Sequence, residues 1–560
     1  METVSARARG VERLAALALA LLVLAATQIP ALWGWRAQRL GHYPTRVFTG
    51  SLYTYADDAA TYWSWMDQAR EGRLAFTDRF THEEHPRNYV NLLFFTLGSV
   101  SRLTGAGVVK VYSAARPVLG AILFFLLYLL AGRLYARPEE RFVCFLFLLL
   151  SSGWEGIGSL VGPHIGISHV SSAQWWTPEM STFFSLVLFP HFLAGFICMA
   201  GSLLLVMAAW SAEEKPMRTR VRLALGAGAV LFVLTFFHPY DVVALVGTVA
   251  ATPFLFALLG QGTLRRDLTL SAVVLGVWLP ALLYNYWLFT QNPAMRAWDL
   301  QNIMITPTPL GLLVCLGVGL PLALLSLLAL RRMGRPVLVM WVWLAVILFC
   351  IQLPVRFQRR MIGGVQFPLA ALAAAGLFLV VLPWLTRVFP QPRARAPLAL
   401  GLGLLIAPLE VTTPFYVCHA EWNRLRGVAY PAWLPAPLRA SLGYLAGAPG
   451  QEAVVLASYD TGNYVPHYSG KRCVLGHYAL TIDADRRQEE IARFFSEEKA
   501  DDAWRTAMLR TWRARYLVLG PYERALGRFD AASRPWLKLL HVEGAGTPDE
   551  TAVYAVELPL

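Results

Sequence analysis

The sequence predicts a polytopic α-helical membrane protein with a small soluble α/β domain at its C-terminal end. Of its 560 residues 56% are hydrophobic and only 15% are charged, and the mean hydropathy is +0.47, which is too apolar for a soluble protein of this size. Apolar runs of a length that can span a membrane recur between short clusters of Arg and Lys. The net charge of +13 lies in those clusters, which are typical of cytoplasmic membrane loops, so we expect no nucleic-acid partner.

The apolar runs predict about eleven membrane-spanning helices. The N-terminal run resembles a signal peptide, but because no small-residue cleavage site stands out and more runs follow, we interpret it as a retained first helix. The run at 89–104 is too short and too polar to span, so we expect it to lie in the interface or to re-enter. The predicted spans are 14–34, 113–132, 141–153, 183–209, 222–238, 241–260, 268–288, 309–330, 337–353, 363–386 and 397–416.

The distribution of Lys and Arg over alternate loops predicts the orientation. We expect a multi-pass protein of the cytoplasmic (inner) membrane with its N-terminus in the cytoplasm. The 35–112 loop and the residues after about 417 then lie on the outer side of that membrane. One segment, 354–360, breaks the rule because it puts Arg356, Arg359 and Arg360 on the outer side. Positive charge on that side requires a local partner, and a phosphate is the obvious one.

The composition changes to that of a soluble domain near residue 445. We therefore predict a transmembrane domain at 1–444, with a large first outer loop at 35–112, and a soluble extracytoplasmic α/β domain at 445–560. The latter has no Gly-rich phosphate loop or nucleophile elbow, so we expect it to cover the outer mouth of the membrane site. Its predicted strands are 453–458, 472–476, 515–520 and 551–558, and its predicted helices are 486–498 and 501–513.

Two adjacent carboxylates, Asp57 and Asp58, follow the first apolar run. Negative charge just past a membrane span lies at the level of the lipid headgroups, which suggests chemistry on a lipid-borne substrate. The plainer interpretation is a pair of surface acids or helix N-caps, because Asp before Ala-Ala-Thr-Tyr is a good helix start.

In the first outer loop the acid Asp58 is followed by an aromatic residue, Tyr62, then by Gln68 and by the pair Glu71-Gly72. In a polytopic chain this loop resembles that of the GT-C glycosyltransferases, such as the protein O-mannosyltransferases and the aminoarabinose transferase of lipid A. The resemblance implies a polyprenyl-phosphate sugar donor and an inverting attack at the anomeric carbon. It also implies that Asp58 acts as a base on the acceptor hydroxyl or positions it, with Asp57 as its neighbour. Many of these enzymes have an acid followed by Glu, so the Asp-Asp pair leaves open which of the two is essential.

Further polar residues at the ends of spans and strands are candidates for substrate binding. Each has a plainer interpretation: a helix-entry charge for Glu179, a hydrogen bond to a neighbouring helix for His191, and a tight turn for His238 and Asp241. In the C-terminal domain the plainer interpretation is a strand-end polar group. The predicted substrate-binding residues are Glu179, His191, His238, Asp241, Asn463, His477 and Thr481.

The three outer arginines, Arg356, Arg359 and Arg360, are the predicted donor-phosphate site. A guanidinium offers a planar fork of donors to a phosphate that gains charge as it leaves. The alternative is interfacial snorkelling to lipid phosphates. The stretch from His82 to His85 suggests a metal, but it lacks the His-Glu-x-x-His order, so we interpret it as a solvated loop. We expect no metal site and no cofactor, with a divalent metal left open.

The predicted function is therefore transfer of a monosaccharide from a polyprenyl-phosphate donor to a hydroxyl of a lipid, glycan or protein acceptor at the outer face of the membrane. Two other functions stay open. A flippase or transporter of lipid-linked sugars would not require the large outer loop or the soluble domain, and the chain shows no inverted hydropathy repeat. An O-antigen ligase or polymerase would share the topology and the outer arginines but would not need the Asp pair.

Overall fold

The computed structural model describes residues 6–52, 56–161, 164, 177–211, 214–388 and 395–558. The chain forms two compact units, and each is assembled from segments far apart in the sequence. Unit 1 consists of Met1–Ile29, Ala115–Asn285 and Met304–Ala420, and unit 2 consists of Pro30–Ala114, Tyr286–Ile303 and Glu421–Leu560. The domain boundary that the sequence predicts near residue 445 stays a prediction.

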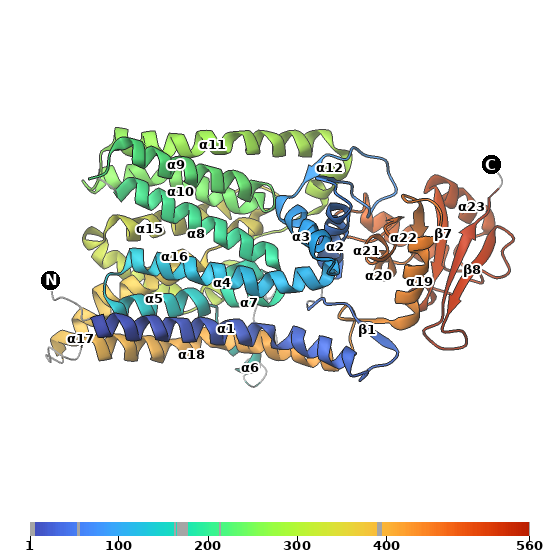
Figure 1. Cartoon of the computed structure of the whole chain (residues 1–560), viewed down its shortest axis with the longest axis horizontal. Coiled ribbons are helices and arrows are strands. Elements are labelled where there is room, and N and C mark those ends of the chain that lie inside the picture. The colour runs from blue at the N-terminus through green and yellow to red at the C-terminus, as the bar shows by residue number, and fades with distance from the viewer. Residues whose placement is uncertain are drawn as a thin grey trace. The chain divides into compact units, whose positions relative to one another are not determined.

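Unit 1 is built from apolar helices (Figure 1). In it α8, α9 and α10 pack side by side, α10 packs on α15, and α16 packs on α5, α14 and α15. The helices that lie wholly or mainly in this unit are α1 (Ala6–Arg39), α4 (Val108–Leu134), α5 (Pro138–Leu150), α6 (Glu155–Val161), α7 (Thr182–Leu188), α8 (Pro190–Ser211), α9 (Met217–Thr235), α10 (Pro239–Leu258), α11 (Leu264–Gln291), α13 (Pro309–Leu316), α14 (Gly319–Ser326), α15 (Arg335–Cys350), α16 (Gln366–Gly376), α17 (Leu382–Val388) and α18 (Arg395–Arg426). Short helical turns, η2 (Pro178–Met180) and η4 (Gln358–Ile362), connect some of them.

Each apolar run that the sequence analysis identifies contains a helix or a pair of helices. Within the described residues, however, only seven helices are long and apolar enough to cross a membrane, or eight if one bent pair counts as a span, so the count of eleven is not confirmed. The helices α5 and α15 have only 13 and 16 residues, and α9 carries three arginines in its first two turns. The bent pair consists of Pro309–Leu316 and Gly319–Arg332, which meet at an angle of 87°. Gly317 lies between them, and its φ of +56° is a left-handed conformation that favours glycine.

Unit 2 contains a five-stranded sheet of order β6-β5-β7-β9-β8. The strand β5 is parallel to β6 and β7, whereas β9 is antiparallel to β7 and β8. The predicted strands and helices of the C-terminal domain are confirmed, and β8 was missed because charged and exposed side chains interrupt its apolar pattern, as is usual for an edge strand. The elements are β5 (Val454–Leu456), β6 (Arg472–Cys473), α22 (Ala484–Phe494), α23 (Asp502–Thr511), β7 (Ala514–Leu519), β8 (Leu537–Glu543) and β9 (Thr551–Val556).

The first outer loop also belongs to unit 2. It contains β1 (Arg46–Phe48), which pairs with β4 (Trp433–Pro435), and the helices α2 (Ala56–Arg70) and α3 (Leu92–Thr104). The two helices pack closely, because a Cβ on Gly98 of α3 would lie 2.4 Å from the Met66 carbonyl of α2. The 89–104 run thus forms a short helix beside the acid-bearing helix, and its position at a membrane surface stays a prediction.

Candidate active site

Asp58 lies in the first turn of α2. Its side chain is 26% exposed, and its Oδ1 lies 3.7 Å from Nε2 of His477. A carboxylate at this end of a helix is stabilised by the helix dipole. The side chain of Asp57 lies outside the described residues. Tyr62, one turn further along α2, stacks on Phe94 of α3 with ring centroids 4.6 Å apart. The N-terminal turn of α2 therefore presents an acid that both solvent and a histidine can reach.

His477 is buried and is held by backbone hydrogen bonds. Its Nδ1 accepts from the backbone N–H groups of Ala479 and Leu480, at 3.0 and 3.2 Å. A ring nitrogen that accepts hydrogen bonds carries no proton, so the neutral ring carries its proton on Nε2, the atom nearest to Asp58. The sequence analysis identified both residues, and the structure brings them together.

A second acid of the first outer loop, Asp78, is fully buried and was missed by the sequence analysis. Its Oδ1 accepts from the backbone N–H of Phe80 at 2.8 Å, and Oδ2 has no hydrogen-bond partner among the described residues. Burial raises the pKa of the Asp78 carboxyl to about 7, and the hydrogen bond from Phe80 opposes this shift. A buried carboxyl with a pKa near neutrality is a feature of functional sites. The only signal in the sequence is an acid between two aromatic residues, Phe76 and Phe80.

The stretch from His82 to His85 is packed against the C-terminal domain rather than solvated. His82 is buried, and burial lowers its pKa to about 4. His85 accepts from the backbone N–H of Asp78 through Nε2 at 3.0 Å, and its Nδ1 lies 2.9 Å from the Glu83 carbonyl. The prediction of a solvated loop is correct for Glu84, which is 76% exposed, and wrong for His82. The part of the chain that the structure describes contains no group of three or more acid, Cys or His side chains that could hold a metal ion.

The C-terminal domain binds this part of the first outer loop through hydrogen bonds and an ion pair. Arg472 donates to the Thr81 carbonyl at 3.0 Å, and Arg487 pairs with Glu83 at 2.8 Å. Thr481 donates to the Phe80 carbonyl at 2.7 Å and accepts from the backbone of Gly476. These contacts fix the loop that carries Asp78 on the domain that carries His477.

Unit 1 holds a second group of predicted residues, centred on Glu179 and Arg360. Glu179 is almost fully buried in η2, and its Oε1 lies 3.5 Å from Nη1 of Arg360 in η4. Its other oxygen, Oε2, has no hydrogen-bond partner among the residues that the structure describes. The backbone also joins the two turns, because Gly364 donates its N–H to the Glu179 carbonyl at 3.2 Å.

Asp241, His238 and His191 form the other side of this group. Oδ2 of Asp241 lies 2.6 Å from Nδ1 of His238, and the His238 and His191 rings are 5.5 Å apart. Oδ1 of Asp241 has no hydrogen-bond partner in the described residues, and it lies against Gly363, where an added Cβ would approach it to 2.3 Å. Because Gly363 directly precedes Gly364, the residues of both turns form one buried polar cluster.

The remaining predicted residues belong neither to the Asp58–His477 pair nor to the buried polar cluster of unit 1. Arg356 is exposed, and Nη2 of Arg359 lies 3.2 Å from the Met304 sulfur. Asn463 is fully buried and donates to the Tyr459 carbonyl at 3.1 Å. Thr481 is also fully buried, and its hydroxyl is used by the contacts described above. Arg360 contacts another predicted site residue, Glu179, through the ion pair described above.

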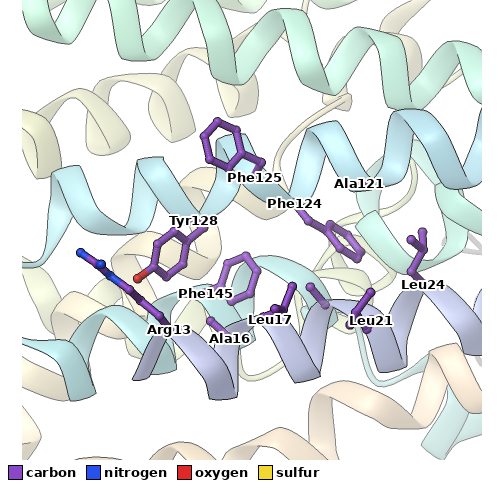
Figure 2. A pocket seen from close by; sticks show the side chains of 11 residues that line it. Arg13, Ala16, Leu17, Leu21, Leu24, Ala121, Phe124, Phe125, Tyr128 and Phe145 are labelled. Carbon is purple, nitrogen blue, oxygen red and sulfur yellow. The ribbon is translucent and has the colours of Figure 1, made fainter. Parts of the chain in front are cut away.

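An apolar cavity of ≈ 220 Å³ lies between α1, α4 and α5 of unit 1 (Figure 2). Leu17 and Leu21 of α1 face Phe124 of α4 across it, and Arg13 and Tyr128 lie at one end. Tyr128 donates to Glu12 at 2.9 Å at that end. None of the predicted site residues lines this cavity, so it is separate from both groups of candidate residues.

No protein-family model matches the sequence, and no curated protein matches it by sequence. Its fold, however, is similar to solved structures of membrane glycosyltransferases. The oligosaccharyltransferase AglB from Archaeoglobus fulgidus, in complex with an inhibitory peptide and a dolichol-phosphate, aligns with a TM-score of 0.54 at 11% identity over 89% of this chain and 69% of that chain. ArnT from Cupriavidus metallidurans, bound to undecaprenyl phosphate, aligns with a TM-score of 0.50 at 13% identity over 96% of this chain and 97% of that chain. The chain therefore has the GT-C fold, and the predicted fold class of a multi-pass membrane protein with a C-terminal α/β part is confirmed.

Proposed function

We propose that this chain is an inverting glycosyltransferase that moves a monosaccharide from a polyprenyl-phosphate donor to an acceptor hydroxyl at the outer face of the cytoplasmic membrane. The observation that carries the proposal is the partly exposed Asp58 carboxylate in the first turn of α2, in a chain with the GT-C fold. One solved protein with this fold was bound to undecaprenyl phosphate and another to a dolichol-phosphate, so lipid-linked phosphates are the donors to test. The acceptor is a lipid, a glycan or a protein.

In this proposal Asp58 accepts the proton of the acceptor hydroxyl while that oxygen attacks the anomeric carbon of the sugar. The bond from the anomeric carbon to the phosphate oxygen breaks, and the lipid phosphate leaves with the bonding electron pair. Arg360, with Arg356 and Arg359 in support, stabilises the negative charge that develops on the leaving phosphate. The mechanism uses no cofactor and no step that requires a metal.

The buried cluster of unit 1 has the chemistry of a sugar-binding site. One oxygen each of Glu179 and Asp241 has no hydrogen-bond donor among the described residues, and buried acceptors of this kind are costly unless a ligand satisfies them. Sugar hydroxyls are donors that suit such oxygens. We therefore assign Glu179 and Asp241 to sugar binding, with His191 and His238 alongside them. The assignments of Asn463 and Thr481 stay predictions.

The orientation and the domain division are part of the proposal. Positive charge in alternate loops supports a cytoplasmic N-terminus, and it supports an extracytoplasmic location for residues 445–560, which we propose form a soluble domain. Labelling of single cysteines introduced at exposed Arg9 and Arg510 in intact cells would test the orientation. Access of an impermeant reagent to position 510 and not to position 9 is the expected result.

The function is tested with purified protein and a panel of radiolabelled polyprenyl-phosphate sugars. Asp58→Asn is expected to lower transfer about 100- to 10,000-fold while donor binding persists, because the amide accepts no proton. Asp57→Asn is expected to lower it less, through its effect on the ionisation of a neighbouring carboxylate. The matched control is Asp67→Asn, an acid on the same helix whose Oδ2 lies 2.6 Å from Nδ1 of His467.

Four results would contradict the proposal. Wild-type transfer by Asp58→Asn would place the base elsewhere, as would complete loss of transfer in Asp57→Asn alone. Movement of a lipid-linked sugar across a vesicle membrane without covalent transfer would identify a flippase. Transfer from pyrophosphate-linked oligosaccharides only would identify a ligase or polymerase.

A further inference from the structure

The His477 ring is held rigidly in one protonation pattern. Its Nδ1 accepts two backbone hydrogen bonds, the Tyr478 ring stacks beside it at 4.8 Å, and the Phe80 ring meets its edge at 6.2 Å. A second proton on the ring would require both backbone hydrogen bonds to break. Within these contacts the ring is therefore neutral and directs one N–H, on Nε2, toward its neighbour.

The neighbour of that N–H is the Asp58 carboxylate. The Nε2 to Oδ1 separation of 3.7 Å is longer than a direct hydrogen bond, but such contacts are often long in the absence of substrate and tighten when it binds. Asp78 interacts electrostatically with His477, and Asp78 itself lies near Arg472 and Glu83. Asp78 is fully buried with a pKa of about 7, so Asp58 is the acid of this centre that a substrate can reach.

The segment that carries His477 is hydrogen-bonded to two other segments of unit 2, the helix α12 and the first outer loop. Gln301 of α12 (Pro293–Gln301) donates to the carbonyls of Ala479 and Thr481, at 3.0 and 2.8 Å. Thr481 in turn donates to the Phe80 carbonyl of the first outer loop. The position of His477 is therefore set by three segments of unit 2 and not by its own loop alone.

We propose that His477 is a positioning residue that orients the Asp58 carboxylate and keeps it ionised for proton transfer, through a single N–H donor on Nε2. This rests on the proposed role of Asp58 as the base. The C-terminal domain then contributes to the reaction directly, because it supplies the group that aims the base. A donor to a carboxylate favours its charged form, so loss of the donor makes the acid protonate at a higher pH.

The test compares two substitutions of His477 in the full-length protein. His477→Leu removes the donor and is expected to lower kcat roughly 10- to 100-fold with little change in the KM for the donor lipid. It is also expected to move the acid limb of the pH profile of kcat/KM to higher pH. His477→Gln keeps an N–H donor and an acceptor on a side chain of similar reach, and it is expected to restore most of kcat and the wild-type acid limb.

The chain offers a matched control in a second histidine–acid pair on α2. His467 lies 2.6 Å from Asp67, and Asp67 has no role in the proposed reaction. His467→Leu breaks a contact of the same kind between the C-terminal domain and the same helix, and it is expected to leave the acid limb where it is. If the acid limb shifts in this variant as well, the effect of His477→Leu is explained by loosened packing between the C-terminal domain and α2, and the proposal is overturned.

Dependence on Asp58 is tested by combining the substitutions. If His477 acts through Asp58, adding His477→Leu to Asp58→Asn lowers the residual activity no further. Full additivity overturns the positioning role, as does wild-type turnover in a folded His477→Leu variant, and both leave the base assignment intact. Wild-type turnover in Asp58→Asn instead overturns the proposed function and this inference together.

Discussion

The acids of the two units differ in their solvent exposure and in the hydrogen-bond partners of their carboxylate oxygens. In unit 2, Asp58 is 26% exposed and faces the Nε2 proton of a fixed histidine. In unit 1, Glu179 and Asp241 are each 2% exposed, and one oxygen of each has no hydrogen-bond partner among the described residues. A general base must be ionised and must reach its substrate, whereas a buried acceptor without a donor is suited to bind one. The contrast separates a carboxylate suited to proton transfer from carboxylates suited to binding.

The largest expected effect concerns Asp78, the buried acid of unit 2. Its carboxyl has an ordinary pKa of 3.8 and a folded-state pKa of about 7. The contribution of this carboxyl to the free energy of unfolding is fully present below pH 3.8. It falls as the pH rises to about 7 and does not change further above that pH. With 1.36 kcal/mol per pKa unit, the cost at pH 8 is at most about 4 kcal/mol.

Asp78→Asn removes that cost and retains an oxygen for the Phe80 N–H. Its free energy of unfolding is therefore expected to exceed that of the wild type at pH 8 and to match it near pH 4. Denaturant titrations of the purified protein at several pH values measure the difference. The control is Glu498→Gln, which alters an exposed acid and is expected to give no such gain. A gain of equal size at both pH values would show that Asp78 is not kept protonated by the fold.

The next effect tests whether Arg360 serves a substrate or only its neighbour Glu179. Arg360→Gln is expected to raise the barrier by about 2–4 kcal/mol, which is roughly a 30- to 1,000-fold loss of turnover, if the guanidinium stabilises the leaving phosphate. The variant Arg360→Gln with Glu179→Gln removes both charges of the pair, so no acid is left without its cation. Turnover of the double variant that stays well below that of Glu179→Gln alone supports phosphate binding.

Recovery of turnover in that double variant to the level of Glu179→Gln alone would instead show that Arg360 only neutralises Glu179. The matched control is the buried pair Arg220 and Asp267, 3.8 Å apart in the same unit. Its double neutralisation, Arg220→Gln with Asp267→Asn, is expected to alter stability and leave the KM for the donor lipid unchanged.

The sequence was sufficient for the fold class, because apolar runs and arginine clusters depend on membrane physics that acts locally along the chain. Its count of eleven spans is not confirmed, because a short apolar helix such as α15 has the same composition whether it spans a membrane or is buried in a bundle. It identified Asp58 and His477 separately, but it could not pair them, since tertiary packing joins α2 to a loop of the C-terminal domain. The sequence analysis missed Asp78 because only its burial distinguishes it from an ordinary loop acid.

The smallest expected effect tests the packing of the unit 1 cluster. A Cβ on Gly363 would lie 2.3 Å from Oδ1 of Asp241, and Asp241 has little room to move. Its other oxygen is 2.6 Å from His238 and would be 2.9 Å from a Cβ on Gly195. Gly363→Ala is therefore expected to cost about 1–3 kcal/mol of stability, as overpacked cores do.

The control for this substitution is Gly401→Ala in α18, where an added Cβ meets no atom within 4 Å. Because alanine favours a helix over glycine by about 0.5–1 kcal/mol, this variant is expected to be slightly more stable than the wild type. Thermal unfolding of both variants in one detergent measures the difference. Since the added methyl group displaces Asp241 from His238, Gly363→Ala is also expected to weaken donor-lipid binding, and an unchanged KM for that lipid would remove Asp241 from the proposed sugar site.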